Sequence, residues 1–197
     1  WSTEPINRNN DVDKLLNSKI FSWVYLHLYS CKNRINNEFS HLTNICSVMH
    51  NAAPKEKFNF SNKKNIFSIF NRTASIRRKY WLWPARKYIT RIHDRFGDDY
   101  FTDLQNTNIS INIHVSKKSL DDFETGIFEA MASGCMVISE RIYDQSIKDL
   151  NMKNAILQVD SPYELKQNLI DLFNNKDLIK QYQNNSIDAI QNNTWNN

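Results

Sequence analysis

Short β-prone runs alternate with helical stretches from about residue 60 onward, and few folds accommodate that alternation. The strand-like runs cover residues 65–70, 109–115, 135–139 and 155–159. The third of these is short and almost wholly apolar, which is typical of a strand in a parallel sheet that helices cover on both faces. Because helical stretches connect the runs, we predict an α/β domain with a doubly wound, mostly parallel, Rossmann-like sheet.

Glycine and proline mark the ends of the predicted helices. Residues 76–96 are predicted to form a helix that breaks at Pro84 and ends at Gly97. Residues 127–133 are predicted to form another helix, followed by Gly134. We place Gly134 just after the last turn, because glycine adopts a left-handed backbone at little cost.

Two further helices are predicted at the C-terminal end. The first begins at residues 161–164, where a serine precedes a proline and a glutamate follows three residues after the serine. This is a helix-capping pattern. The second covers the amphipathic stretch 176–190. Residues 99–106 are expected to form a short helix or a turn.

The first sixty residues are less regular. Residues 20–29 are apolar and β-prone, which favours a buried strand, and residues 39–49 fit either a helix or a strand. Residues 52–57 are polar and contain a proline, so we place a boundary there. We therefore predict two parts: residues 1–57, a remnant of an N-terminal domain or a linker, and residues 58–197, the Rossmann-like domain.

Composition excludes several classes of protein. Hydrophobic residues make up 41% of the chain and aromatic residues 12%, which rules out wholesale disorder. No apolar run reaches the roughly 18 residues that a membrane span requires. Three scattered cysteines are too few for a disulfide framework, and no CxxC pair suggests a zinc site. We expect no bound metal and a reducing, cytoplasmic location.

The ends and the charge of the chain add two expectations. The first residue is Trp1, and no charged-then-apolar signal segment follows it, so we expect a fragment or a processed product. The net charge of +4 suits an anionic ligand such as a nucleotide. It is too small and too dispersed to indicate nucleic-acid binding.

Residues 121–139 are the most informative stretch. A polar loop reaches Thr125 and Gly126 and then enters a helix. Free backbone N–H groups and the helix dipole make such a start an anion site, and Gly126 lacks the Cβ that would block a phosphate. In open α/β sheets these loops lie at the carboxyl ends of strands, where ligands bind. Glu129, one turn into the helix, can accept hydrogen bonds from a ribose diol.

The segment Glu129-Ala-Met-Ala-Ser-Gly-Cys-Met-Val-Ile-Ser139 resembles the C-terminal, donor-binding domain of group-1 GT-B glycosyltransferases, and within them most closely the CgeB-like branch. The resemblance extends over about residues 65–195. It implies metal-independent transfer of a sugar from a nucleotide-diphosphate sugar to a glycan, lipid or protein acceptor, with no cofactor besides that donor. It also implies that the chain is part of a longer enzyme of cell-surface polysaccharide biosynthesis.

The resemblance assigns roles to individual residues. In the family, two acidic residues flank seven others, and the second matches Glu129, which would bind the donor ribose. The first falls on Asp121, where the family has a longer glutamate; it would face the donor sugar and stabilise positive charge at the anomeric carbon. Glu124 is the competing candidate for that catalytic role, because it lies nearer the helix start. The donor would also contact Thr125, Gly126 and Ile127.

Arginines near the first strand of the regular region are candidates for the donor pyrophosphate. Arg72 follows that strand directly, and Arg77 begins the next helical stretch. Guanidinium groups suit phosphate oxygens, so either could bind the pyrophosphate; a solvated helix face is an equal alternative. Arg141, after the 135–139 strand, has the same two interpretations.

Other interpretations stay open at this point. Glu129 could be an ordinary exposed helix residue and Asp121 an ordinary loop carboxylate. The chain could be a non-catalytic nucleotide-sugar-binding module or, more distantly, a fucosyltransferase-like enzyme. Trp81 and Trp83 beside the basic cluster could stack on single-stranded nucleic acid, although core packing fits them better. We expect nucleotide-sugar and glycan-type partners, no nucleic acid and no transmembrane segment; a peripheral membrane contact and the oligomeric state are left open.

Overall fold

The computed structural model describes residues 10–18, 20–26, 29–53, 58, 60, 64–73, 75–91, 95–115 and 123–194. It divides the chain into two compact units, Trp1–Asn51 and Ala52–Asn197. Each unit is described by itself. Asp121, one of the two candidate catalytic acids, lies outside the described residues.

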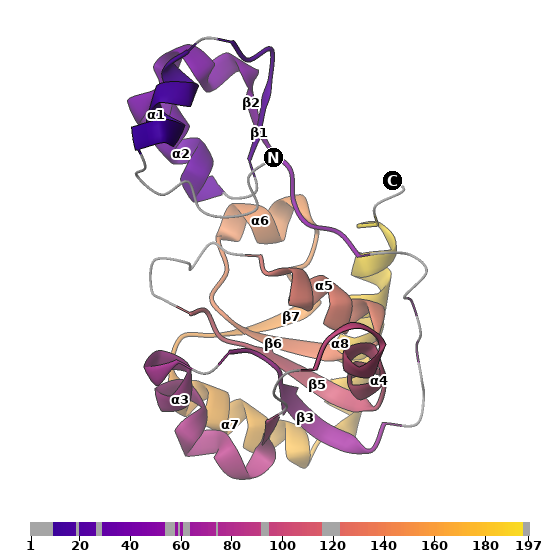
Figure 1. Ribbon diagram of the computed structural model, residues 1–197. Helices are drawn as coiled ribbons and strands as arrows, with labels where there is room; N and C mark the ends of the chain where they lie inside the picture. The colour runs from indigo at the N-terminus through magenta and orange to yellow at the C-terminus, as the bar shows by residue number, and fades with distance from the viewer. Residues whose placement is uncertain are drawn as a thin grey trace. The chain divides into compact units, whose positions relative to one another are not determined.

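The first unit is a small β-α-β arrangement with its own core. Its elements are α1 (Asn10–Asn17), β1 (Val24–Leu26), α2 (Tyr29–Glu38), the 3-10 helix η1 (Ser40–Ile45) and β2 (Cys46–Val48). The two strands pair in parallel, with Val24 opposite Cys46, and α2 lies between them in the chain (Figure 1). Leu26, Ile35 and Leu42 are buried in this core.

The prediction for this unit was right in part. The strand expected over residues 20–29 is shorter, because β1 has only three residues and α2 already begins at Tyr29. Residues 39–49, which fitted either a helix or a strand, contain both in succession, η1 and then β2.

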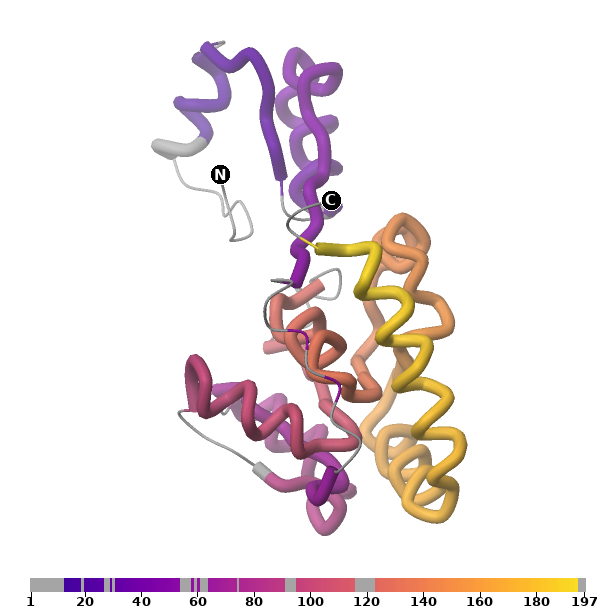
Figure 2. The backbone as a smooth tube through the Cα atoms, turned by 90° about the vertical axis from the view of Figure 1, so that its right-hand side faces the viewer, coloured from indigo at the N-terminus to yellow at the C-terminus, as the bar shows by residue number. Residues whose placement is uncertain are grey.

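The second unit is a parallel sheet with helices on both faces, which confirms the predicted doubly wound, Rossmann-like architecture (Figures 1 and 2). In chain order its elements are β3 (Ile66–Phe70), α3 (Ile76–Leu82), the 3-10 helix η3 (Trp83–Tyr88), β4 (Thr90–Arg91), α4 (Gly97–Gln105), β5 (Thr107–Asn112), α5 (Thr125–Ala132), β6 (Met136–Glu140), α6 (Asp144–Asp149), β7 (Ile156–Val159), α7 (Pro162–Phe173) and α8 (Lys176–Gln191).

Two apolar layers hold the helices on the sheet. Leu104, Phe128 and Ile190 are buried in one layer, under α4, α5 and the end of α8. Trp81 and Leu169 are buried in the other, under α3, η3 and α7. Figure 2 shows the long α8 running along the unit, and α7 contacts α8. Both faces of the sheet are therefore covered, as the apolar sequence of β6 predicts.

The strand order places a switch point between β3 and β5. Among the described residues the order is β4-β3-β5-β6-β7, and all pairings are parallel. From β3 the chain first moves outward to β4 and then returns to the other side of β3 as β5. Connections on the two sides of such a point diverge and leave a crevice outside the carboxyl ends of the strands, where ligands of open α/β sheets bind.

One helix prediction was wrong in its length and in its end. The α-helix from Ile76 gives way to 3-10 geometry at Trp83, and the helical stretch ends at Tyr88, far short of residue 96. Pro84 cannot continue the α-helical hydrogen-bond ladder, and 3-10 helices are rarely long. The chain is then free to pair Thr90 with Ile69 as the edge strand β4.

Two of the three glycines have a left-handed backbone. Gly97 begins α4 with φ +58° and does not end the preceding helix, contrary to the prediction. Gly134 follows α5 with φ +70°, and its N–H donates to Met131 O at 2.9 Å, which confirms the predicted helix end. The capping pattern at α7 is also confirmed, because Ser161 Oγ accepts from Glu164 N at 3.1 Å.

Candidate functional site

The start of α5 lies at the carboxyl edge of the sheet, next to the switch point. Glu124 is the N-cap residue, with φ −62° and ψ 141°, and its side chain makes no capping hydrogen bond. Gly126 and Ile127 are buried, and Thr125 is exposed. Ile127 N donates to Glu124 O at 2.9 Å, so the amides of Thr125 and Gly126 are the ones at this helix start that lack a partner within the helix and can meet an external acceptor.

Arg72 lies directly against this helix start. It follows β3 by two residues, and its side chain is 23% exposed. A Cβ added to Gly126 would overlap the Arg72 guanidinium. The space that glycine opens is therefore filled by a guanidinium, where the sequence suggested clearance for a phosphate.

Glu124 connects the basic side chains of the site. Its Oε2 accepts from Arg72 Nε at 3.0 Å, and its Oε1 lies 3.4 Å from Arg78 Nη2. The same Oε1 lies 3.7 Å from His114 Nδ1, which is too long for a hydrogen bond. Burial alone would raise the pKa of Glu124, but His114, Arg72 and Arg78 together hold this pKa below its usual value. Glu124 is thus an ionised carboxylate held between two arginines.

Glu129 faces the same guanidinium from the next turn of α5. Its side chain is half-buried. Burial raises its pKa, and the positive charge of Arg72 offsets part of that rise. Tyr100 on α4 is also buried near Arg72, and its pKa is raised to about 12 by burial, again with Arg72 opposing. Glu129 is therefore a desolvated carboxylate beside a cation, not a solvent-facing helix residue.

Arg77, the other predicted pyrophosphate ligand, is held by a carboxylate. Arg77 Nη1 donates to Glu140 Oε2 at 2.7 Å, and Nη2 pairs with Glu140 Oε1. Nη1 also donates to His114 O at 2.7 Å, and His114 N donates to Glu140 Oε2 at 3.2 Å. This network fastens the start of α3 to the ends of β5 and β6. A role for Arg77 in phosphate binding stays a prediction.

Arg78 fixes the loop after β3. Its Nε donates to Ile113 O at 2.7 Å and its Nη1 to Thr73 O at 3.1 Å. The side chain is only 7% exposed, and burial lowers its pKa. Arg78 therefore holds the segment that carries Arg72 and also contributes charge to Glu124.

The structure brings most of the predicted site residues together. Arg72, Glu124, Gly126 and Glu129 form one cluster. Arg141 lies apart from that cluster in an exposed pair with Asp160, at 2.8 Å.

Sequence reasoning did not single out Arg78, Glu140 or Tyr100. Glu140 gave a usable signal, because it directly follows a predicted strand and so belongs to the carboxyl edge. Tyr100 gave none, because only the packing of α4 on the sheet brings it near Arg72.

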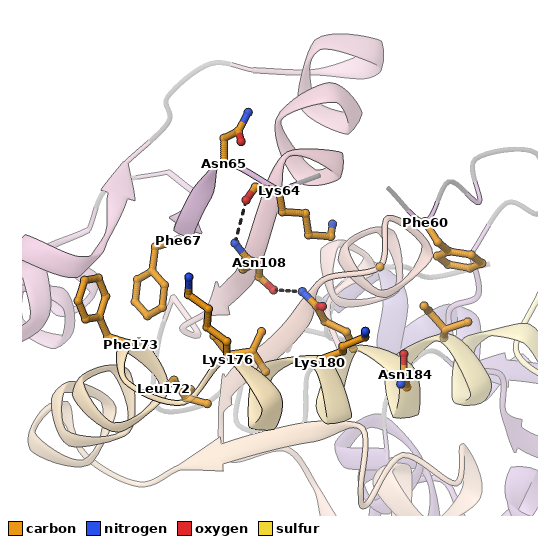
Figure 3. Close-up of a pocket in the computed structure, with 14 residues that line it drawn as sticks. Phe60, Lys64, Asn65, Phe67, Asn108, Leu172, Phe173, Lys176, Lys180 and Asn184 are labelled. Carbon is orange, nitrogen blue, oxygen red and sulfur yellow. Dashed lines mark hydrogen bonds between the residues drawn. The ribbon is translucent and has the colours of Figure 1, made fainter. Parts of the chain in front are cut away.

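A cavity of about 760 Å³ lies at the opposite, amino-terminal edge of the sheet (Figure 3). Lys176 and Lys180 of α8 line it, and Gln183 Nε2 donates to Asn108 O at 3.1 Å across its floor. Lys64 also lines it, but its ammonium donates to Ser133 O at 2.9 Å and to Gln105 O at 3.2 Å. No carboxylate is among the described lining residues, so this cavity lacks the acceptor that a ribose diol needs.

The described part of the chain offers neither a metal site nor a membrane span. No group of three or more metal-ligating side chains is present there. No helix there is both long and apolar enough to cross a bilayer.

Comparison with solved structures shows which known fold this is. A glycosyltransferase from Rickettsia africae ESF-5 matches 96% of this chain and 64% of its own, with a TM-score of 0.71 at 16% identity. Anabaena HepE, solved with UDP and glucose, matches 88% of this chain and 59% of its own, with a TM-score of 0.64 at 11% identity. The pneumococcal O-GlcNAc transferase GtfA, solved with UDP and GlcNAc, matches 94% of this chain and 45% of its own, with a TM-score of 0.62 at 13% identity.

At these identities the likeness shows the fold: the chain has the architecture of GT-B glycosyltransferases, as the sequence resemblance implied. It spans less than two thirds of the length of each of these structures. No protein-family model matches the sequence, and no curated protein matches it. Assignment to the CgeB-like branch stays a prediction.

Proposed function

We propose that this chain is the donor-binding part of a metal-independent glycosyltransferase, which transfers a sugar from a nucleoside-diphosphate sugar to a glycan, lipid or protein acceptor. The observation that carries the proposal is the Arg72 guanidinium seated against Gly126 at the start of α5, with Glu129 one turn behind it. The fold supports it, because solved structures of this architecture include glycosyltransferases with bound UDP.

The diphosphate would bind Arg72 and the first amides of α5. A guanidinium fork and a helix start both favour phosphate oxygens. In this structure Arg72 Nε donates to Glu124, so an incoming diphosphate competes with that carboxylate. Arg72 Nη1 donates to Asn71 O at 3.2 Å, and Nη2 is the guanidinium nitrogen nearest Gly126, so Nη2 would be the first to meet a phosphate oxygen at the helix start.

The ribose would bind Glu129. A carboxylate accepts two hydrogen bonds and so fits the two hydroxyls of the diol. Burial has already removed part of the water from this carboxylate, as its raised pKa indicates. Hydroxyl donors from a nucleoside would replace that lost hydration.

In the transfer step, the bond between the anomeric carbon and the diphosphate oxygen breaks, a bond to the acceptor oxygen forms, and the proton of the acceptor hydroxyl passes to the leaving diphosphate. Arg72 and the α5 amides would stabilise the negative charge that develops on the leaving diphosphate. An acidic side chain facing the donor sugar would stabilise positive charge at the anomeric carbon. Glu124 and Asp121 are the candidates for that role.

Calorimetric titration with a panel of nucleoside diphosphates and nucleotide sugars tests the proposal. We expect Arg72→Ala to weaken binding roughly tenfold to a hundredfold, the loss typical of a hydrogen bond to a charged group. Arg141→Ala is the matched control, because Arg141 follows β6 at the same edge but is 57% exposed and paired with Asp160. Equal affinities for both variants, or no heat with any member of the panel, would refute the proposal.

Transfer by the longer protein separates the enzyme from the alternative, a non-catalytic nucleotide-sugar-binding module. Both bind the donor, but only the enzyme forms a glycosylated product. Tight binding without any transfer would favour the module.

A further inference from the structure

The outer face of α3 and η3 exposes three large apolar side chains. Ile76, Tyr80 and Trp83 are 90%, 69% and 66% exposed. Their spacing of four and three residues places them on one helix face. The opposite face is also apolar, since Trp81 and Leu82 are buried in the core beneath it. A surface helix normally turns polar residues outward, so this exposed face indicates an interaction surface.

Basic side chains surround these apolar ones. Lys79, Arg86 and Lys87 are exposed. The Arg86 guanidinium lies 4.2 Å from the centroid of the Trp83 ring. Residues 76–88 contain no aspartate or glutamate, and no ion pair joins these three cations to a carboxylate within the described residues. The face is therefore both apolar and uniformly positive.

We propose that this face, the α3–η3 surface (Ile76, Lys79, Tyr80, Trp83, Arg86 and Lys87), docks the chain on an anionic lipid bilayer. Tryptophan and tyrosine rings favour the headgroup region of a bilayer, and helices with mixed apolar and basic faces lie in that interface. The long stems of lysine and arginine reach outward to lipid phosphates while covering apolar surface.

Charge and shape favour a bilayer over a second copy or another protein. A second copy laid face to face would bring the same three cations against each other, with no acidic residue in the segment to pair with them. Ile76 and Tyr80 lie on α3, and Trp83 begins η3 directly after it. The helix α3 lies at the margin of the second unit (Figure 1). Ile76, Tyr80 and Trp83 are not among the residues that line the 760 Å³ cavity. A bilayer interface accepts projecting rings without a preformed groove.

Vesicle flotation of the 197-residue chain tests the proposal, with no nucleotide present. We expect binding to phosphatidylcholine vesicles that contain 30% phosphatidylglycerol, and much weaker binding to phosphatidylcholine alone. Each cation near an anionic surface strengthens binding about fivefold, so Lys79→Ala, Arg86→Ala and Lys87→Ala together should weaken it about a hundredfold. Tyr80→Ser with Trp83→Ser should weaken it roughly tenfold or more, since apolar burial is lost.

Matched variants elsewhere on the surface control for net charge and for exposed rings. Lys148→Ala, Lys153→Ala and Lys180→Ala remove the same charge, and Phe96→Ser with Tyr163→Ser removes two rings that are 79% and 71% exposed. Both controls should float as the wild type does. Absence of wild-type flotation, or equal losses in patch and control variants, would overturn the proposal. So would a dimer, seen by light scattering, that the Tyr80→Ser and Trp83→Ser variant abolishes. Because no nucleotide is needed, this outcome is independent of the proposed function.

Discussion

At the scale of single residues, one glycine determines where a guanidinium can lie. Gly126 is helical and does not adopt a left-handed backbone, so the helix itself does not require glycine there. Alanine would favour the helix by up to about 1 kcal/mol. The Arg72 guanidinium does require glycine, because a Cβ at residue 126 would overlap it. Displacement of Arg72 would also break its hydrogen bond with Glu124, which offsets the gain in helix stability. Ligand binding should therefore respond to this substitution more strongly than stability does.

Gly126→Ala should weaken the binding of a nucleoside diphosphate about tenfold or more, because Arg72 is displaced from the helix start. The melting temperature should change by no more than a few degrees, because the gain in helix stability and the loss of the Arg72–Glu124 hydrogen bond oppose each other. Calorimetry and a thermal melt on the same sample measure both. Unchanged affinity would mean that the placement of Arg72 against Gly126 has no role in binding.

Glu124 should stabilise the fold at neutral pH and lose this effect in acid. Its pKa in the folded protein lies below the ordinary value of 4.5, since His114, Arg72 and Arg78 outweigh burial. The stability it adds is thus complete above that value and is lost as the pH falls through the folded pKa. Glu124→Gln should cost about 1–2 kcal/mol at pH 7. Urea unfolding from pH 7 to pH 3 should show a flatter profile for the variant; parallel profiles would contradict this account.

The residues that sequence could identify are those whose role depends on local position. Arg72 follows a strand and Glu129 lies one turn inside a helix, and both facts can be obtained from pattern alone. Arg78 and Glu140 could not be paired with their partners in this way. The contact of Arg78 with Ile113 O depends on β3 lying beside β5, and the contact of Glu140 with His114 N depends on β5 lying beside β6. Which strands lie side by side is set by the strand order of the sheet, and no local sequence pattern predicts that order.

At the scale of elements, the buried strands were predictable and the edge strand was not. The strands β3 and β7 lie within the predicted runs, β6 ends one residue beyond its run, and β5 begins two residues before its run and ends three residues before the end of it. These four strands carry a clear signal because both faces of the sheet are covered. By contrast, β4 has two residues and pairs only with β3. A strand of two residues has no periodicity of its own. The predicted helix over residues 76–96 was therefore extended across β4.

Lys64 joins two elements through their ends. Its ammonium donates to Gln105 O at the end of α4 and to Ser133 O at the end of α5. Lys64→Met leaves these carbonyls without a partner and should lower the free energy of unfolding by about 1–3 kcal/mol. Lys180→Met is the control, because Lys180 lines the same cavity but is exposed, and its effect should stay within about 0.5 kcal/mol. Equal denaturation midpoints for the two variants would contradict the role of Lys64 in capping the ends of α4 and α5.

At the scale of the whole molecule, fold class followed from the sequence more readily than the organisation of the first unit did. The alternation of strands and helices was enough to predict the doubly wound sheet. The first unit has two strands of three residues each, and short apolar runs of this kind do not distinguish strands from helices. The boundary between the two compact units falls between Asn51 and Ala52 in the chain, and each unit has its own buried core.

The central claim is that a nucleoside diphosphate binds with its phosphates at Arg72 and its ribose at Glu129. Calorimetric titration with a nucleoside diphosphate and with its 2′,3′-dideoxy analogue, on the wild type and on Glu129→Ala, measures this directly. The account predicts that removing the diol weakens wild-type binding roughly tenfold to a hundredfold and leaves the affinity of Glu129→Ala almost unchanged. If the wild type binds both ligands equally well, or if Glu129→Ala discriminates between them as strongly as the wild type does, the claim is wrong.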